Sequence, residues 1–391
     1  MVTNFPPVDD YINWLDDTRD CFAPGARFHA AEVEPHTDGL PRGRTGRFGV
    51  VFKMTAANQF YALKCFTEPD PDRAGRYRLL TERLAGASMN WVVPVEFDER
   101  GIKGWDGRWW PTVTMPWVGG SPLVDWLDDH RGDRAAVERC RMDFARTMAS
   151  LEDSGLAHGD LQPDNVLVEA GDRIRLIDYD GMFVPGLHNL ELRQSGISSF
   201  QHPAWPEHGR LGPTMDRFPA RLIHLSLLAL TYDPGLWTEL HTDGSHALFF
   251  EADDLSDPGR SERIARLWGI PDATIHRELV QLTKDLRHRT GVMSIPPLDP
   301  VYRRLDPLGF VASPRPRATG LPGAGARPGP RTTGAQHRRP PGGTVPAPWS
   351  PPAHPTVPGP STPPRQRRKP HYAFAGVFLA LLVLVVLTLI L

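Results

Sequence analysis

The chain has 391 residues, of which 40% are hydrophobic and 11 are Trp, enough for a substantial buried core. Ten of its 44 Lys and Arg residues follow Asp306, the last acidic residue, so residues 1–311 carry 34 basic and 46 acidic side chains, about −12 net. This charge argues against a nucleic-acid-binding body. Three cysteines, widely spaced and odd in number, argue against a disulfide framework or a zinc site.

The first part of the chain predicts a short helix and then a small β-sheet. Apolar residues at helical spacing predict the helix over residues 8–22. A glycine-rich turn over residues 43–49 leads into an apolar strand, and glycines there would let backbone N–H groups approach phosphates closely. The next strand, residues 60–66, alternates around a single lysine, Lys64.

A helix and two more strands complete this part of the chain. The helix is predicted over residues 73–87 and carries Glu82. Residues 91–97 and 109–118 have the composition of the last two strands. An amphipathic helix is predicted over residues 133–154, just before the most informative stretch of the chain.

That stretch, residues 158–181, contains a tight loop followed by two short apolar runs separated by a turn. Asp160 and Asn165 lie on the loop, and Asp178 ends the second apolar run. Two short strands joined by a turn would bring the three polar side chains together at one end. Phosphoryl transfer needs such a set: one carboxylate to orient the attacking hydroxyl, and a carboxylate with a carboxamide to hold magnesium on nucleotide phosphates.

The following segments predict the remainder of a helical region. Residues 182–206 lack periodicity. Asp216 then precedes a helix that is apolar almost all round, which predicts burial at the centre of the region. Helices over residues 261–268 and 273–289 complete it.

The last part of the chain changes character twice. Residues 312–372 are rich in Pro, Gly and Arg without acidic residues and predict a disordered linker. Residues 373–391 are apolar, and at helical rise they span roughly 28 Å, close to the thickness of a bilayer's hydrocarbon core. Basic residues just before this segment predict a single-pass cell-membrane protein whose folded body is cytoplasmic.

The His158-Gly159-Asp160 loop with Asn165 and Asp178 resembles the catalytic loop and metal-binding aspartate of the protein-kinase-like superfamily, whose motifs are H-R-D-L-x-x-x-N and D-F-G. With the membrane anchor, the chain resembles bacterial Ser/Thr protein kinases. The resemblance covers about residues 40–308. It implies an α+β, two-lobed fold. The implied parts are a helical N-terminal extension, a β-rich lobe and a helical lobe, at residues 1–39, 40–118 and 119–311.

The resemblance also implies roles for the polar residues. Asp160 would position the attacking hydroxyl, and Asn165 and Asp178 would bind Mg²⁺. Lys64 would bind the phosphates of ATP and pair with Glu82 on the following helix. Asp160, Lys64 and Asn165 are therefore the predicted catalytic residues.

The remaining nucleotide contacts would come from a loop and a hinge. Gly46, Gly49 and Val51 match the later positions of the phosphate-covering loop of kinases. The segment after the last strand resembles the kinase hinge, where the Pro116 carbonyl and the Val118 N–H would bind adenine.

Four positions depart from the kinase pattern. Arg44 stands at the first glycine of the loop, and Gly159 replaces the arginine that holds a phosphorylated activation segment. Gln162 replaces a lysine common in Ser/Thr kinases, and Asp180 stands where D-F-G has glycine.

The sequence therefore predicts a membrane-tethered, ATP-dependent kinase acting on Ser/Thr hydroxyls of unidentified proteins in signalling. Two alternatives stay open. One is a pseudokinase scaffold that binds nucleotide or partners without turnover. The other is a small-molecule phosphotransferase of the aminoglycoside or choline kinase type, since the His-Gly-Asp opening is typical of those enzymes.

Overall fold

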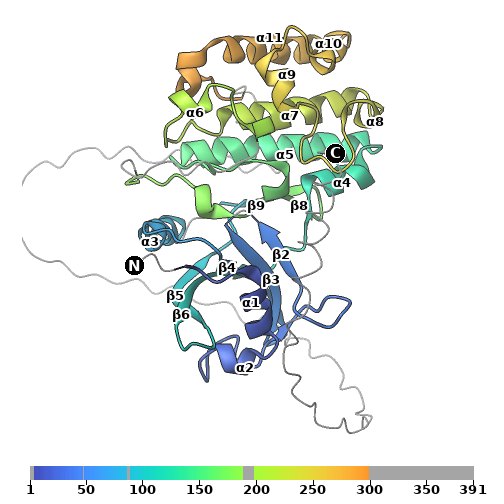
Figure 1. Ribbon diagram of the computed structural model, residues 1–391. Coiled ribbons are helices and arrows are strands. Elements are labelled where there is room, and N and C mark those ends of the chain that lie inside the picture. The colour runs from blue at the N-terminus through green and yellow to red at the C-terminus, as the bar shows by residue number, and fades with distance from the viewer. Residues whose placement is uncertain (1–3, 47, 86–88, 188–197, 299–391) are drawn as a thin grey trace, which may run out of the picture. The chain divides into compact units, whose positions relative to one another are not determined.

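The computed structural model describes residues 4–46, 48–85, 89–187 and 198–298, which form a mixed α+β structure with a β-sheet beside a helical part (Figure 1). The predicted linker and membrane helix, residues 312–372 and 373–391, lie outside the described residues. Within the described ranges, no helix combines the length and apolar character needed to cross a membrane.

The large sheet is antiparallel and has the strand order β1-β3-β4-β6-β5, with β2 also paired to β3. Its strands are β1 (Glu32–Val33), β2 (Gly43–Gly46), β3 (Gly49–Ala56), β4 (Gln59–Phe66), β5 (Glu96–Lys103) and β6 (Trp109–Pro116). Val51 and Lys64 are partners in the β3–β4 register, so their side chains share one face of the sheet. This face joins the apolar core that continues into the helical part.

The other face of the sheet is covered by the N-terminal segment. The single helix predicted over residues 8–22 is in fact two, α1 (Val8–Leu15) and α2 (Thr18–Cys21), because the Asp17 side chain accepts the N–H of Arg19 and starts a new helix. We call the buried side chains on this face the N-terminal cluster: Tyr11, Trp14, Leu15, Cys21, Phe22 and Phe28 against Val50, Phe52, Met54, Leu63, Cys65, Ile102 and Trp110.

The strand predicted over residues 91–97 is misplaced, because β5 spans Glu96–Lys103 and only residues 96 and 97 belong to it. The backbone before it pairs with the helical part instead of the sheet. The carbonyl of Trp91 accepts the N–H of Leu176, and the N–H of Val93 donates to the Tyr179 hydroxyl at 2.9 Å. These bonds satisfy the backbone groups that a strand would otherwise pair.

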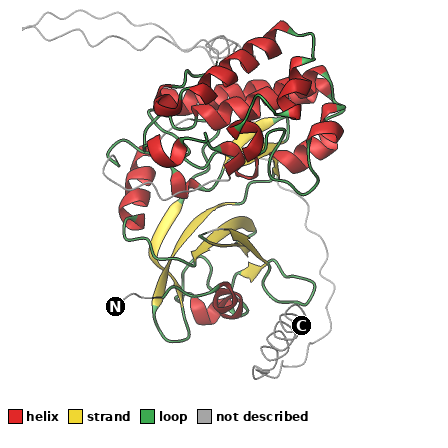
Figure 2. Cartoon of the chain, turned by 45° about the horizontal axis from the view of Figure 1, so that its top comes forward, coloured by secondary structure: helices red, strands yellow, loops and turns green. Residues whose placement is uncertain are grey.

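The helical part is built around two long helices that lie side by side (Figures 1 and 2). The first, α5 (Arg134–Asp153), confirms the helix predicted over residues 133–154, and the Asp133 side chain caps its N-terminus. The second, α7 (Arg217–Tyr232), is buried over most of its length, which confirms the expected central helix. Around them lie α4 (Leu123–His130), α6 (Trp205–His208), α8 (Leu236–Leu240), α9 (Ala252–Ser256), α10 (Glu262–Trp268) and α11 (Ala273–Arg287).

A small sheet and one helix sit where the two parts meet. The small sheet contains β7 (Ser121–Pro122), β8 (Val166–Glu169) and β9 (Arg173–Leu176), and β8 and β9 form the hairpin that the sequence predicts. The helix is α3 (Arg73–Leu84), beside the large sheet (Figure 1). The loop before β8 and the segment after β9 carry the candidate site.

Candidate active site

The loop before β8 is fixed to the start of α7 by Asp216. Its buried carboxylate accepts the backbone N–H groups of His158 and of Gly159, the latter at 2.9 Å. The imidazole Nε2–H of His158 donates to the carbonyl of Ile177 at 2.8 Å, which joins the loop to the segment after β9. Because these groups are withdrawn from water, each unmade bond would be costly, so the loop conformation is strongly specified.

Gly159 is required at its position for two physical reasons. Its φ of +78° lies in the left-handed region, and a Cβ there would lie 1.9 Å from the carbonyl oxygen of Gly181. No side chain fits without moving one of the two segments. The position where kinases have arginine is therefore closed to arginine by backbone packing.

Asp160 and Asn165 are joined on this loop. The Asn165 Nδ2 donates to the Asp160 carbonyl at 2.8 Å and lies 3.3 Å from Asp160 Oδ2. The other oxygen, Oδ1, is buried, and no donor among the described residues reaches it. Burial raises the pKa of Asp160, and the nearby charge of Asp178 acts in the same direction. An unpaired carboxylate oxygen with a raised pKa is suited to accept a proton from a hydroxyl.

Lys64 reaches from the sheet to the segment after β9. Its Nζ lies 2.6 Å from Asp178 Oδ1 and 2.7 Å from Asp180 Oδ2, and only 8% of its side chain is exposed. Burial alone favours the neutral amine, but the two carboxylates outweigh it and raise the pKa of Lys64, so the side chain is a fixed cation. The structure thus brings Lys64 to Asp178 across 114 positions of sequence.

Asp178 and Asn165 have the chemistry of magnesium ligands. Asp178 has a left-handed backbone with φ of 63°, unusual for a residue with a side chain, and its carboxylate is 37% exposed. The Asn165 amide nitrogen is used by Asp160, which leaves its oxygen for another partner. Within the described part of the chain, no group of three or more His, Cys, Asp or Glu side chains could hold a metal. A Mg²⁺ carried by nucleotide phosphates needs only one or two protein oxygen donors, which this pair would supply.

The predicted pairing of Lys64 with Glu82 is wrong. Glu82 is exposed on α3, and the carboxylates that meet Lys64 are Asp178 and Asp180. The residue of α3 that faces this cluster is Tyr77, whose hydroxyl donates to Asp180 Oδ1. Five residues correspond to about 140° around a helix, so Glu82 points away from the side that Tyr77 occupies. Within the described residues, no ion pair joins Glu82 to Lys64.

Asp180 departs from the kinase pattern and had no predicted role, and Arg76 and Tyr77 were not predicted to belong to the site. The carbonyl of Asp180 accepts a hydrogen bond from Arg76 Nη1 at 2.8 Å. An acid two residues after Asp178 was the available signal. Its meaning depends on where α3 docks, which the local pattern does not specify.

The predicted phosphate loop and hinge occupy the expected elements. Gly46 and Gly49 face each other at the end of the β2–β3 hairpin. The N–H of Trp117 donates to the Phe60 carbonyl at 2.9 Å, and Pro116 and Val118 flank it. Their contacts with a nucleotide stay predictions, as does the contact of Val51.

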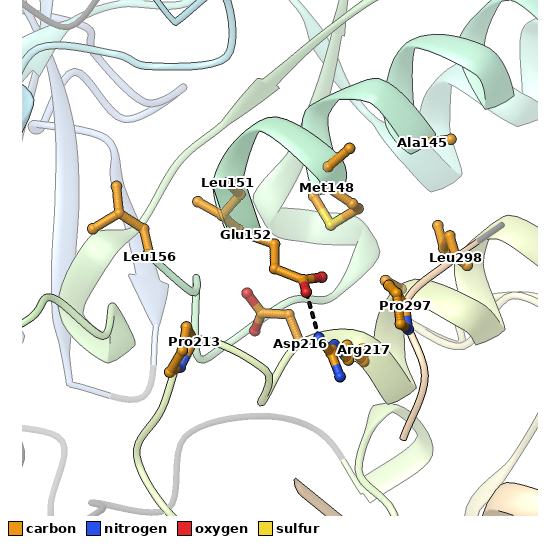
Figure 3. Close-up of a pocket in the computed structure, with 12 residues that line it drawn as sticks. Ala145, Met148, Leu151, Glu152, Leu156, Pro213, Asp216, Arg217, Pro297 and Leu298 are labelled. Carbon is orange, nitrogen blue, oxygen red and sulfur yellow. Dashed lines mark hydrogen bonds and ion pairs between the residues drawn. The ribbon is translucent and has the colours of Figure 1, made fainter. Parts of the chain in front are cut away.

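Asp216 lies between two pockets of the helical part. One pocket opens beside Asp160 and is lined mainly by apolar and aromatic side chains, among them Leu161, Phe200, Trp205, Met215 and Phe218. The other lies between α5 and α7, where Glu152 and Arg217 form an ion pair next to Asp216 (Figure 3). The pocket beside Asp160 is the one of the two that reaches the loop of the candidate site.

Comparison with known proteins gives a partial similarity. No protein-family model matches the chain. It is 25% identical to Rho-associated protein kinase let-502 of Caenorhabditis briggsae over 146 residues, and 27% identical to the myotonin-protein kinases of Homo sapiens and Mus musculus over the same length. These matches cover 36% of this chain, 11% of the first relative and 22% of the other two. They indicate a distant kinase-like relationship.

Proposed function

We propose that this chain is an ATP- and Mg²⁺-dependent protein kinase, held at a membrane, that transfers the γ-phosphoryl group to Ser or Thr hydroxyls in signalling. The observation that carries the proposal is the meeting of Lys64 with Asp178, next to a loop that presents Asp160 and Asn165. The partial similarity to protein kinases supports the same activity. Asp160 would take the hydroxyl proton, Lys64 would hold phosphate oxygens, and bound Mg²⁺ would offset the charge of the phosphates.

The direct test is labelled phosphate transfer from Mg-ATP by the full chain and by Asp160→Asn. This change keeps the size of the side chain and removes the base, so labelling should fall by about 10²- to 10⁴-fold. Asp164→Asn is a matched control, because Asp164 lies on the same loop but pairs at the surface with His246. It should keep wild-type labelling to within about twofold, since exposed pairs contribute little. Equal labelling by wild type and Asp160→Asn would refute the assignment.

A pseudokinase is the second candidate, and one observation favours it. Arg44 occupies the first glycine position of the phosphate loop, and its guanidinium lies 5.1 Å from the centre of the Trp117 ring beside the hinge. This side chain could hinder productive placement of phosphates. In that case ATP would bind, but wild type and Asp160→Asn would show the same phosphate turnover.

A small-molecule phosphotransferase gives a third distinguishable result. ATP consumption would rise on addition of a metabolite or an antibiotic while no protein became labelled. Mass spectrometry of the expressed chain separates this outcome from a protein kinase. Phosphate on the hydroxyls of the predicted linker would favour the protein kinase. These hydroxyls belong to Thr319, Thr332, Thr333, Thr344 and Ser350.

The membrane anchor is proposed from sequence alone, on the apolar run of residues 373–391. The test compares extraction of the full chain from membranes at alkaline pH with that of the double variant Leu382→Arg and Val386→Arg. Two central arginines cost about 5 kcal/mol of insertion free energy, so the variant should leave the membrane and wild type should stay. Release of the wild-type chain under the same conditions would remove the tether from the proposal.

A further inference from the structure

Asp180 lies at the junction of three elements of the site. Its Oδ2 is 2.7 Å from Lys64 Nζ, and its Oδ1 accepts the Tyr77 hydroxyl. Its backbone carbonyl accepts Arg76 Nη1 at 2.8 Å. The sheet and α3 are therefore both bonded to this one residue.

The charge balance around Lys64 needs more than one carboxylate. A buried ammonium group is stable only when an anion compensates it. In this structure Asp178 and Asp180 share that task. Asp178 is also the predicted Mg²⁺ ligand, and its carboxylate is more exposed than that of Asp180, at 37% against 19%. Asp180 can therefore keep Lys64 charged and in place while Asp178 serves the metal.

Helix α3 has a different part in this arrangement from the one the kinase pattern implies. It does not supply the acid for Lys64, because Glu82 is exposed. It supplies Arg76 and Tyr77, which hold Asp180 by its carbonyl and its side chain. The acid that positions the lysine is thus Asp180, from the segment that carries Asp178, and α3 holds Asp180 in place through hydrogen bonds.

We propose that Asp180 is the positioning residue that holds Lys64 for nucleotide phosphates, in place of the carboxylate that the kinase pattern puts on the helix. The inference rests on the proposed function in one respect: it takes the ligand of Lys64 to be the phosphates of ATP. It predicts that nucleotide affinity depends on Asp180 and is independent of Glu82.

The test is calorimetric binding of ATP to the full chain, with Mg²⁺ and with EDTA, for Asp180→Asn and Glu82→Gln. Both variants replace a carboxylate by a carboxamide, so they are chemically matched. Asp180→Asn should bind Mg-ATP about ten- to a hundredfold more weakly, because Lys64 loses a charge-assisted partner. It should also need more Mg²⁺ for half-maximal ATP binding, because Lys64 then competes with the metal for Asp178. Glu82→Gln should match wild type in both measurements.

Tyr77→Phe separates the effect of the hydrogen bond that holds Asp180 from the effect of the negative charge of Asp180. It removes the hydroxyl that donates to Asp180 but leaves the carboxylate beside Lys64. We expect a lower unfolding temperature, because a charge-assisted hydrogen bond is lost, and a Mg-ATP affinity within about threefold of wild type, because the Asp180 anion stays beside Lys64. Loss of affinity equal to that of Asp180→Asn would contradict the assignment of the effect to charge.

A double-variant cycle covers the case in which Asp180→Asn folds poorly. Lys64→Met combined with Asp180→Asn removes a cation and an anion together, so it should recover the unfolding temperature that Asp180→Asn loses. Its ATP affinity should equal that of Lys64→Met alone. A further loss in the double variant, by the factor seen in the wild-type background, would show that Asp180 acts without Lys64 and would overturn the proposal.

Failure of the proposed function gives a different pattern. A wild-type chain that binds Mg-ATP but transfers no phosphate would refute the kinase while leaving the binding comparison valid. Wild-type affinity in Asp180→Asn, or equal weakening in Glu82→Gln, would refute the role of Asp180 while leaving phosphoryl transfer in place.

Discussion

The two halves of the candidate site are held in different ways. In the helical half, two backbone N–H groups of the loop that bears Asp160 donate to Asp216, and the His158 imidazole of that loop donates to the carbonyl of Ile177. In the sheet half, Lys64 and α3 depend on side chains that converge on Asp178 and Asp180. Backbone bonds fix one geometry, whereas side-chain ion pairs can exchange partners. The helical half is therefore suited to orient the reacting hydroxyl, and the sheet half to adjust when nucleotide binds.

Asp216→Ala should break the helical half most severely. It leaves the buried N–H groups of His158 and Gly159 without an acceptor, which costs about 3 kcal/mol or more of unfolding free energy. Phosphate transfer should fall by at least about a hundredfold because the loop loses its geometry. Urea unfolding and labelled transfer measure the two effects. Asp233→Ala, at the C-cap of the same helix, is the control and should cost less than about 1 kcal/mol, because the carboxylate is partly exposed and its ion pair with Arg266 lies at the surface.

Gly159→Ala tests whether close backbone packing holds the same half. The new methyl group would lie 1.9 Å from the Gly181 carbonyl in a left-handed backbone, so we expect a loss of about 2–3 kcal/mol. Gly155→Ala is the matched control. Gly155 has a similar φ of +70°, but a Cβ added there would lie 3.7 Å from its nearest neighbour, the Cγ of Pro185. It should lose only about 1 kcal/mol, the cost of the backbone conformation. Equal unfolding temperatures for the two variants would contradict the packing argument.

Tyr11→Phe sharpens the comparison from the sheet side. The Tyr11 hydroxyl donates to the Phe66 carbonyl at 2.7 Å in a fully buried setting, close to the strand that carries Lys64. Its removal leaves that carbonyl unpaired and should cost about 1–2 kcal/mol of unfolding free energy. Tyr232→Phe, at an exposed position, should change stability by less than about 0.5 kcal/mol. Thermal unfolding of the two variants decides the matter.

The smallest expected effect is the pH dependence of stability that comes from His224, a buried residue of the helical half. His224 is fully buried on α7 and is bonded through Nε2 to Arg141. Burial, with the charges of Arg141 and Arg221, holds the pKa of His224 well below its ordinary value of 6.5. The unfolded chain therefore takes up a proton near pH 6.5 that the folded chain refuses, and stability is lost as the pH falls below that value. The unfolding temperature should drop from pH 7 to pH 5, and less steeply in His224→Gln. Parallel curves would rule out this contribution.

The sequence predicted the helical half of the site well and the sheet half less well, for physical reasons. Asp160, Asn165 and Asp178 lie on one loop and hairpin, so short-range geometry brings them together. Their partner Asp216 precedes a helix whose apolar surface already required burial. The lysine was predicted from its strand, but its acid was assigned to Glu82. The rotation of α3 against the sheet decides which helix residue faces inward, and no local pattern encodes that rotation.

The misplaced strand has a similar origin. Residues 91–97 have strand-forming composition, yet Trp91 and Val93 bond to the segment that follows Asn165. Composition reports that such residues prefer an extended, half-buried setting. It does not report which partner completes the hydrogen bonds. That choice depended on a segment more than eighty positions later in the chain.

The N-terminal cluster has a practical consequence for anyone preparing this protein. A protein truncated at the boundary that the kinase resemblance implies, near residue 40, would lack α1 and α2. One apolar face of the large sheet would then be exposed to water. An exposed apolar face of this kind favours self-association. A soluble preparation has to begin upstream of Val8.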